Sequence, residues 1–239
     1  MELAKNCIDV GLFTNRIAEM RVFYGERIGL KFEEMLPLGG GLQQHRFALR
    51  GSVLKINDSR DQLGPPLPAG YSRLTIADSR LPMQLGLADP DGNYVELRPP
   101  NQAGVSQIEI AIGVSDEDAF ERFYGEALGA ERIEPRRFKI GETVISFTHD
   151  PRACKAPVSG SQSAIDALAS MRAIGFRYIT IQVRDCDAEH RRLLRMGVSV
   201  GSAPTTLGAV ARICFIRDPD GNWIEISQRA SLTGPLPKD

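Results

Sequence analysis

Two matching stretches decide the fold of this chain: Asp89-Pro90-Asp91-Gly92-Asn93-Tyr94-Val95-Glu96-Leu97 and Asp218-Pro219-Asp220-Gly221-Asn222-Trp223-Ile224-Glu225-Ile226. In each stretch proline presets φ, and the Asp-Gly-Asn run tolerates the left-handed backbone of a tight turn. The residues that follow alternate, so Ile224 and Ile226 lie on one face of a strand and Glu225 lies on the other. Each stretch therefore predicts a hairpin turn followed by a strand with one apolar and one polar face.

Other pairs of segments indicate that the whole chain is a duplication. Phe23-Tyr24-Gly25-Glu26 recurs as Phe123-Tyr124-Gly125-Glu126, and Gly70-Tyr71-Ser72-Arg73-Leu74-Thr75-Ile76 is similar to Gly175-Phe176-Arg177-Tyr178-Ile179-Thr180-Ile181. Each half therefore contains two modules, and the proline-rich run Pro99-Pro100-Asn101-Gln102 marks the boundary between the halves. We expect an N-terminal domain at residues 1–100, a C-terminal domain at 101–230 and a flexible tail at 231–239.

Each module begins with an alternating strand, which is followed by an amphipathic helix and further strands. Ile108, Ile110 and Ile112, for example, alternate with polar or small residues. The second module is abbreviated, because residues 77–84 leave no room for a helix comparable to that of the fourth module. Strands and helices mixed in this way predict the α+β class.

Composition narrows the classes of partner. The formal net charge is −1 and no apolar run is long enough to span a bilayer, so we expect neither nucleic-acid nor membrane binding. The N-terminal residues lack the pattern of a signal peptide. The four cysteines contain no C-x-x-C pair, which favours a reducing, cytoplasmic location.

With these motifs the chain resembles the vicinal oxygen chelate superfamily, which includes glyoxalase I, the bleomycin-resistance proteins and the extradiol ring-cleaving dioxygenases. The resemblance covers nearly the whole chain. It implies tandem paired βαβββ modules that form cupped mixed sheets, with helices on the outer face and a divalent metal on the inner face. The metal ligands would come from the first and last strands of the modules. The resemblance also implies a small-molecule substrate or ligand and a homodimer.

The resemblance assigns three positions in each half to an inner pocket. They are Glu109, Tyr178 and Glu225 in the C-terminal half, and Asp9, Arg73 and Glu96 in the N-terminal half. All six lie on the polar faces of predicted strands. In the N-terminal pocket, Arg73 and Arg98 would neutralise Asp9 and Glu96, so we interpret this pocket as degenerate.

Two carboxylates close together in the C-terminal pocket would repel each other. Glu109 and Glu225 could therefore bind a divalent metal (Mg²⁺, Mn²⁺ or Fe²⁺), or, with no metal, one carboxyl could stay protonated and form an acid/base pair, with Tyr178 on the substrate oxygen. The third alternative is an arginine, such as Arg137 or Arg212, that neutralises the pair. The candidate apolar wall of the pocket consists of Phe176, Phe215 and Trp223.

The chain departs from the ring-cleaving dioxygenases. None of its three histidines lies at a ligand position, and Phe215 stands where those enzymes carry a tyrosine. Ring cleavage is therefore the least favoured activity. We expect a lyase or isomerase that transfers a proton on a metabolite with neighbouring oxygens, and the alternative is a non-catalytic small-molecule binding protein of bleomycin-resistance type. The long connection at residues 151–171 predicts either a lid or a plain connector.

Overall fold

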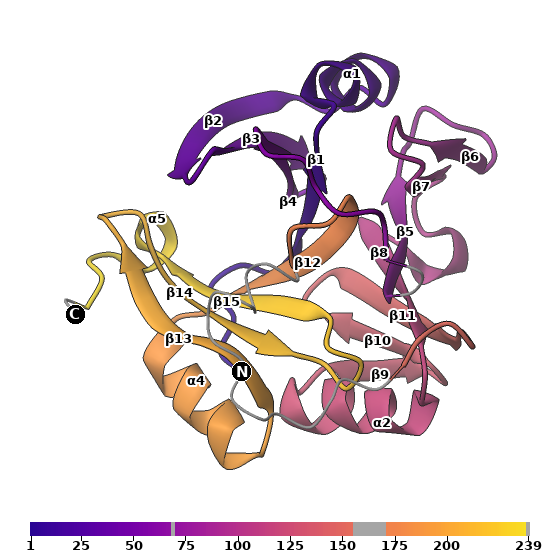
Figure 1. Ribbon diagram of the computed structural model, residues 1–239. Helices are drawn as coiled ribbons and strands as arrows, with labels where there is room; N and C mark the ends of the chain where they lie inside the picture. The colour runs from indigo at the N-terminus through magenta and orange to yellow at the C-terminus, as the bar shows by residue number, and fades with distance from the viewer. Residues whose placement is uncertain (68–69, 155–170, 238–239) are drawn as a thin grey trace.

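The computed structural model describes residues 1–67, 70–154 and 171–237, so most of the predicted lid or connector lies outside the described residues. Two mixed sheets and a few helices make up the fold, which confirms the predicted α+β class (Figure 1). In the described part of the chain, no helix is long and apolar enough to cross a membrane.

Two curved sheets contain all the named strands. In spatial order, the eight-stranded sheet consists of β13 (Ser199–Leu207), β14 (Ala211–Arg217), β15 (Trp223–Arg229), β12 (Gly175–Gln182), β1 (Asp9–Thr14), β4 (Ser52–Ser59), β3 (Leu42–Leu49) and β2 (Phe32–Gly39). The seven-stranded sheet consists of β6 (Leu85–Ala88), β7 (Tyr94–Arg98), β5 (Gly70–Ala77), β8 (Ile108–Val114), β11 (Thr143–His149), β10 (Arg137–Ile140) and β9 (Glu131–Glu134). The apolar faces of both sheets contribute to one shared hydrophobic core.

Each sheet combines one module from each half of the chain. The first strand of the first module, β1, pairs antiparallel with β12 of the fourth module, and β5 of the second module pairs antiparallel with β8 of the third. The sequence predicted instead that each half would form its own pocket. All four first strands carry the same alternation, so periodicity does not determine which of them pair. Each cup is therefore shared between the predicted segments 1–100 and 101–230.

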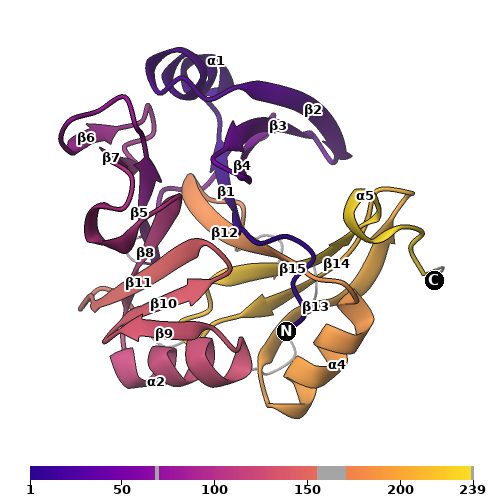
Figure 2. The same ribbon diagram turned by 180° about the vertical axis from the view of Figure 1, so that it is seen from behind.

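Helices follow the first strands of three modules. α1 (Ile17–Arg21) continues into the π-helical turn η1 (Val22–Arg27), α2 (Glu117–Arg122) continues into the π-helical turn η3 (Phe123–Ala127), and α4 (Cys186–Arg195) follows β12. The short helices η2 (Gln102–Gly104) and α5 (Ala230–Thr233) complete the set of described helices, and α5 extends into the predicted flexible tail. Residues 78–84 form no helix, in agreement with an abbreviated second module. Figures 1 and 2 both show α4 along the outside of β13 and α2 beside β9.

The two Asp-Pro-Asp-Gly-Asn turns connect the sheets to each other. The Tyr24 hydroxyl on η1 donates a hydrogen bond to Oδ2 of Asp89 at 2.8 Å, which anchors the turn of the second module to the first module. Likewise, the Ser115 backbone N–H donates to Oδ2 of Asp220 at 2.7 Å, which anchors the turn of the fourth module to the third. Each turn therefore joins two modules that lie in different sheets.

Candidate functional site

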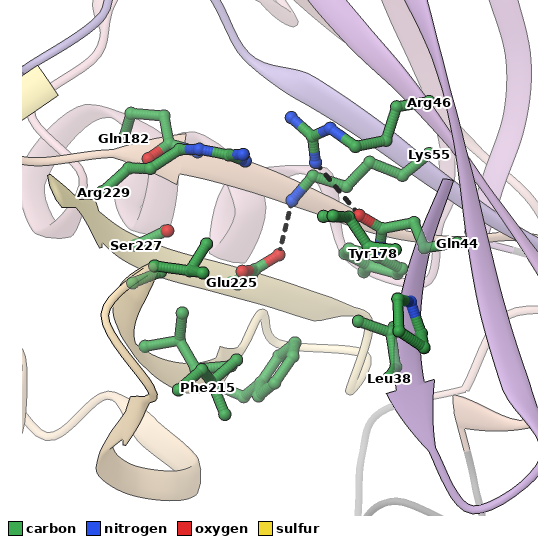
Figure 3. Close-up of a pocket in the computed structure, with 16 residues that line it drawn as sticks. Leu38, Gln44, Arg46, Lys55, Tyr178, Gln182, Phe215, Glu225, Ser227 and Arg229 are labelled. Carbon is green, nitrogen blue, oxygen red and sulfur yellow. Dashed lines mark hydrogen bonds and ion pairs between the residues drawn. The ribbon is translucent and has the colours of Figure 1, made fainter. Parts of the chain in front are cut away.

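A cavity of about 440 Å³ opens on the concave face of the eight-stranded sheet (Figure 3). Its outer part is apolar and includes Leu38, Leu207 and Val210, which belong to two hairpin tips and are 45–48% exposed. Its inner part is polar and consists of Gln44, Arg46, Lys55, Tyr178, Gln182, Glu225, Ser227 and Arg229. A cavity with an apolar entrance and a polar end suits a small amphipathic molecule.

An ion pair between Lys55 and Glu225 lies at the polar end of the cavity. Lys55 Nζ donates to Oε2 of Glu225 at 2.8 Å and to Oγ1 of Thr180 at 2.7 Å, and Thr180 Oγ1 donates to the same Oε2 at 2.7 Å. The side chains of Lys55 and Glu225 are only 5% and 11% exposed. Strand register places Thr180 on β12 directly opposite Glu225 on β15, and the Lys55 side chain reaches both of them from β4. Removing either charged partner would leave the other buried and uncompensated, which is strongly unfavourable.

Tyr178 lies beside this ion pair, and its ring occupies the space above Gly11. A Cβ atom at Gly11 would lie 2.1 Å from Cε1 of Tyr178, so only glycine fits there. The Tyr178 hydroxyl accepts hydrogen bonds from Asn57 Nδ2 at 3.2 Å and Gln44 Nε2 at 3.3 Å. Burial, reinforced by the nearby Glu225 carboxylate, raises the pKa of Tyr178 above its usual value. The hydroxyl therefore stays protonated, and it can donate a hydrogen bond to a ligand.

Two arginines complete the polar end. Arg46 Nη1 donates to Gln44 Oε1 at 3.0 Å, and Arg46 Nε lies 3.1 Å from Oε1 of Glu34. Arg229 Nη2 lies 3.3 Å from the same Glu34 oxygen, so this acid at the edge of the cavity offsets part of their charge. Among the described residues that line the cavity, three are cationic and only Glu225 is anionic. The polar end therefore favours an anionic or strongly polarised oxygen on the ligand.

The structure divides the predicted C-terminal group. Tyr178 and Glu225 line the cavity together, but Glu109 lies on β8 in the seven-stranded sheet. Nη2 of Arg73 and Nη2 of Arg137 each lie 3.7 Å from a carboxylate oxygen of Glu109. Arg137 was predicted from the sequence as an arginine that could neutralise the carboxylates, and in the structure it lies beside Glu109. Glu109 and Glu225 therefore do not meet in one site. The prediction that these two carboxylates together bind a metal or form an acid/base pair is wrong. The cause is that the third module, which carries Glu109, pairs with the second module, whereas the fourth module, which carries Glu225, pairs with the first.

The predicted N-terminal group is divided in the same way. Asp9 belongs to the eight-stranded sheet, where Lys5 Nζ donates to its Oδ1 at 2.7 Å. Arg73 and Glu96 belong to the seven-stranded sheet, where Arg98 forms an ion pair with Glu96. The expected neutralisation therefore takes place, but Asp9 receives its cation from Lys5 and not from an arginine.

The predicted aromatic wall is only partly present. Phe215 lines the cavity, and Trp223 is buried behind it with a ring-centroid distance of 5.7 Å. Phe176 belongs instead to the core shared by the two sheets. Arg212, the other arginine expected to neutralise the carboxylates, pairs with Asp187 at 2.6 Å.

Lys55, Arg46 and Arg229 were not among the predicted site residues. The signal for Lys55 is present in the sequence, because Lys55 and Asn57 alternate with the apolar Leu54 and Ile56. A charged residue on the polar face of a strand next to β1 is a candidate for the inner face of the cup. Its pairing with Glu225 depends on the contact between β1 and β12, which alternation alone does not predict.

The divalent metal implied by the resemblance does not fit the side chains at this site. Within residues 1–67, 70–154 and 171–237, no three or more His, Cys, Asp or Glu side chains form a group that could hold a metal ion. At Glu225, the Lys55 ammonium is already bound to the carboxylate at 2.8 Å. An ammonium group has no lone pair for a metal and repels a second cation at this distance.

Comparisons with known proteins agree with this fold. The sequence profile of the Glyoxalase/Bleomycin resistance protein/Dioxygenase superfamily matches residues 106–226. No curated protein matches the chain in sequence. Glyoxalase I from Zea mays superposes with a TM-score of 0.68 at 13% identity, over 93% of this chain and 92% of that one. A proposed dioxygenase from Bacillus subtilis gives a TM-score of 0.65 at 14% identity, over 96% of this chain and 85% of that one. At these identities the likeness concerns the fold.

Proposed function

The chain belongs to the Glyoxalase/Bleomycin resistance protein/Dioxygenase superfamily, and on this premise we propose that it is an enzyme that transfers a proton on a small amphipathic molecule. One observation carries the proposal: a carboxylate, an ammonium group and a protonated phenol meet at the polar end of an otherwise apolar cavity. A general base next to donors that stabilise a developing oxyanion is the arrangement that proton abstraction beside a carbonyl group requires.

The cavity supports a ligand with two unlike ends. The apolar body would lie against Leu36, Leu38 and Phe215, and the oxygens would lie toward Lys55 and Tyr178. Two of the three Lys55 N–H donors are used by Glu225 and Thr180, and no other described residue accepts from Nζ, so one N–H remains for a ligand oxygen. The volume of about 440 Å³ lies within the range of sites for small molecules.

The proposed step uses groups of this chain alone. Oε1 of Glu225 takes the proton from the carbon next to the carbonyl group. The C–H electron pair then forms the C=C bond of an enolate, and the π pair of the C=O bond moves onto the carbonyl oxygen. The Lys55 ammonium and the Tyr178 hydroxyl donate hydrogen bonds to that oxygen and stabilise its negative charge. Return of the proton to a different carbon completes an isomerisation, whereas departure of a leaving group completes an elimination.

The test is the exchange of carbon-bound hydrogen in D₂O, followed by NMR on a panel of enolisable carbonyl compounds with apolar substituents. Glu225→Gln keeps the shape of the side chain but removes the base, so we expect the exchange rate to fall by about 10²–10⁴-fold. The variant also loses the charge that compensates Lys55, so the exchange is measured on protein shown by circular dichroism to be folded. Glu96→Gln is the matched control, because Glu96 takes the equivalent position in the other sheet. If Glu225→Gln exchanged hydrogen as fast as the wild type, Glu225 would not be the base of the reaction.

A second candidate is a binding protein without catalysis. One observation favours it: Oε2 of Glu225 is already held by Lys55 and Thr180, which leaves the acid satisfied without a ligand. In that case a ligand would bind stoichiometrically and be released unchanged, and Glu225→Gln would change affinity only modestly. The homodimer and the cytoplasmic location expected from the sequence remain predictions.

A further inference from the structure

The two sheets carry equivalent rows of side chains on their concave faces. In the eight-stranded sheet, Asp9, Thr180 and Glu225 lie opposite one another on β1, β12 and β15. In the seven-stranded sheet, Glu109, Thr75 and Glu96 lie opposite one another on β8, β5 and β7. Each row therefore places a first-strand acid and a last-strand glutamate on either side of a threonine.

A cation from the chain itself accompanies every acid in these rows. The pairs are Asp9 with Lys5, Glu225 with Lys55, Glu96 with Arg98, and Glu109 with Arg73 and Arg137. All four acids are buried. Buried carboxylates require a compensating positive charge, and here amino-acid side chains supply it in both sheets.

Lys55 differs from the other cations because it lines the cavity. Its Nζ lies 2.8 Å from Glu225 and 2.7 Å from Thr180, and it has no further hydrogen-bond partner among the described residues. It also lies 5.6 Å from the centroid of the Tyr178 ring. The ammonium group is therefore a fixed positive charge at the base of the cavity with one donor still available.

We propose that Lys55 is a built-in counter-ion that takes the place of a divalent cation beside Glu225, so that the cavity receives the anionic or carbonyl oxygen of its ligand on an ammonium group. The claim that Lys55 receives a ligand oxygen rests on the proposed function. The claim that Lys55 keeps a divalent cation out rests only on its ion pair with Glu225. Because like charges at this distance repel, the wild-type cavity does not bind a divalent ion, and reversal of the charge at position 55 creates a metal site.

The test is titration of the full chain with Mn²⁺ alone, followed by isothermal titration calorimetry. We expect Lys55→Glu to bind about one Mn²⁺ per chain, at least about 100-fold more tightly than any weak surface binding to the wild type, because a repelling charge becomes a ligand. The binding is expected to disappear when Glu225→Gln is added to Lys55→Glu. Lys31→Glu is the matched control, since it makes the same charge change at an exposed site and should behave as the wild type does.

Two results would overturn the inference: wild-type protein that binds Mn²⁺ stoichiometrically and loses it in Glu225→Gln, or folded Lys55→Glu that binds no Mn²⁺. Should Lys55→Glu fail to fold by circular dichroism, Lys55→Met provides the same test, because it removes the ammonium without adding a charge. It should show detectable Mn²⁺ binding at millimolar concentrations, and behaviour identical to the wild type would overturn the inference. These titrations need no turnover, so failure of the proposed reaction is recognised separately by the hydrogen-exchange assay.

Discussion

At the scale of single residues, the position of Tyr178 depends on the absence of a side chain at Gly11. The phenol ring lies where a Cβ atom at position 11 would be, and its hydroxyl is held by Asn57 and Gln44. Three neighbouring strands, β1, β3 and β4, thus fix one hydroxyl group of a fourth, β12. A pre-positioned donor of this kind requires little rearrangement when a ligand binds.

Gly11→Ala tests this dependence. The new methyl group would lie 2.1 Å from the Tyr178 ring, so the ring must move or the backbone must shift, at a cost of about 1–3 kcal/mol in the free energy of unfolding. Urea denaturation measures this loss, and ligand affinity should fall with it. Gly64→Ala is the control, because its nearest neighbours would be at 3.8 Å and 3.9 Å. Equal stability of both variants would contradict the account.

The residues of the site were partly predictable from the sequence. Tyr178 and Glu225 were found because they occupy polar positions on alternating strands within a repeated motif. Lys55 lies on a strand with an equally clear alternation, but its role depends on a partner that is far away in the sequence. The sequence therefore identified one side of the ion pair and missed the other.

At the scale of elements, the Asp-Pro-Asp-Gly-Asn turns do more than reverse the chain. Asp218 Oδ1 accepts hydrogen bonds from the backbone N–H groups of Asp220 and Asn222, and Oδ2 accepts from Asn222 Nδ2. Complete burial nevertheless raises the pKa of Asp218 to about 7, well above the ordinary 3.8. The sequence predicted the turn from proline and glycine, but not the burial of its first aspartate, which results from docking onto another module.

This burial predicts a pH dependence of stability. Between about pH 4 and pH 7 the folded protein binds a proton at Asp218 that the unfolded chain does not bind. The contribution of Asp218 to the free energy of unfolding therefore falls as pH rises through this window and is level above it. Asp218→Asn removes the titrating group. The free energy of unfolding, measured by chemical denaturation, should therefore decrease less from pH 5 to pH 8 in the variant than in the wild type. Asp118→Asn, at an exposed position on α2, should follow the wild type; an unchanged decrease in Asp218→Asn would refute the assignment.

At the scale of the whole molecule, the repeats predicted the modules but not their partners. Four similar first strands can be paired in more than one way, and each way buries the same kind of apolar face. The abbreviated second module was predictable because the number of residues between its strands, which the sequence gives directly, is too small for a helix. The pairing of β1 with β12 and of β5 with β8 is long-range, and it decides which predicted site residues meet.

The interleaved sheets predict that the two halves of the chain do not fold separately. A fragment of residues 1–100 would contain β1 and β5 without their antiparallel partners β12 and β8, which belong to the remainder, 101–239. Each fragment alone should lack a cooperative thermal transition by circular dichroism, and an equimolar mixture should regain it. Cooperative unfolding of either isolated fragment would show that the halves are autonomous.

The same pairing has a consequence for the order in which the protein is made. On the ribosome, the seven-stranded sheet has all of its strands once residue 149 has emerged, whereas the eight-stranded sheet is complete only once residue 229 has emerged. Until residue 182 has emerged, the edge of β1 that β12 later covers has no partner, and unpaired edges promote aggregation. The cavity, with Lys55 on an early strand and Glu225 on the last one, is therefore the final part of the molecule to be assembled.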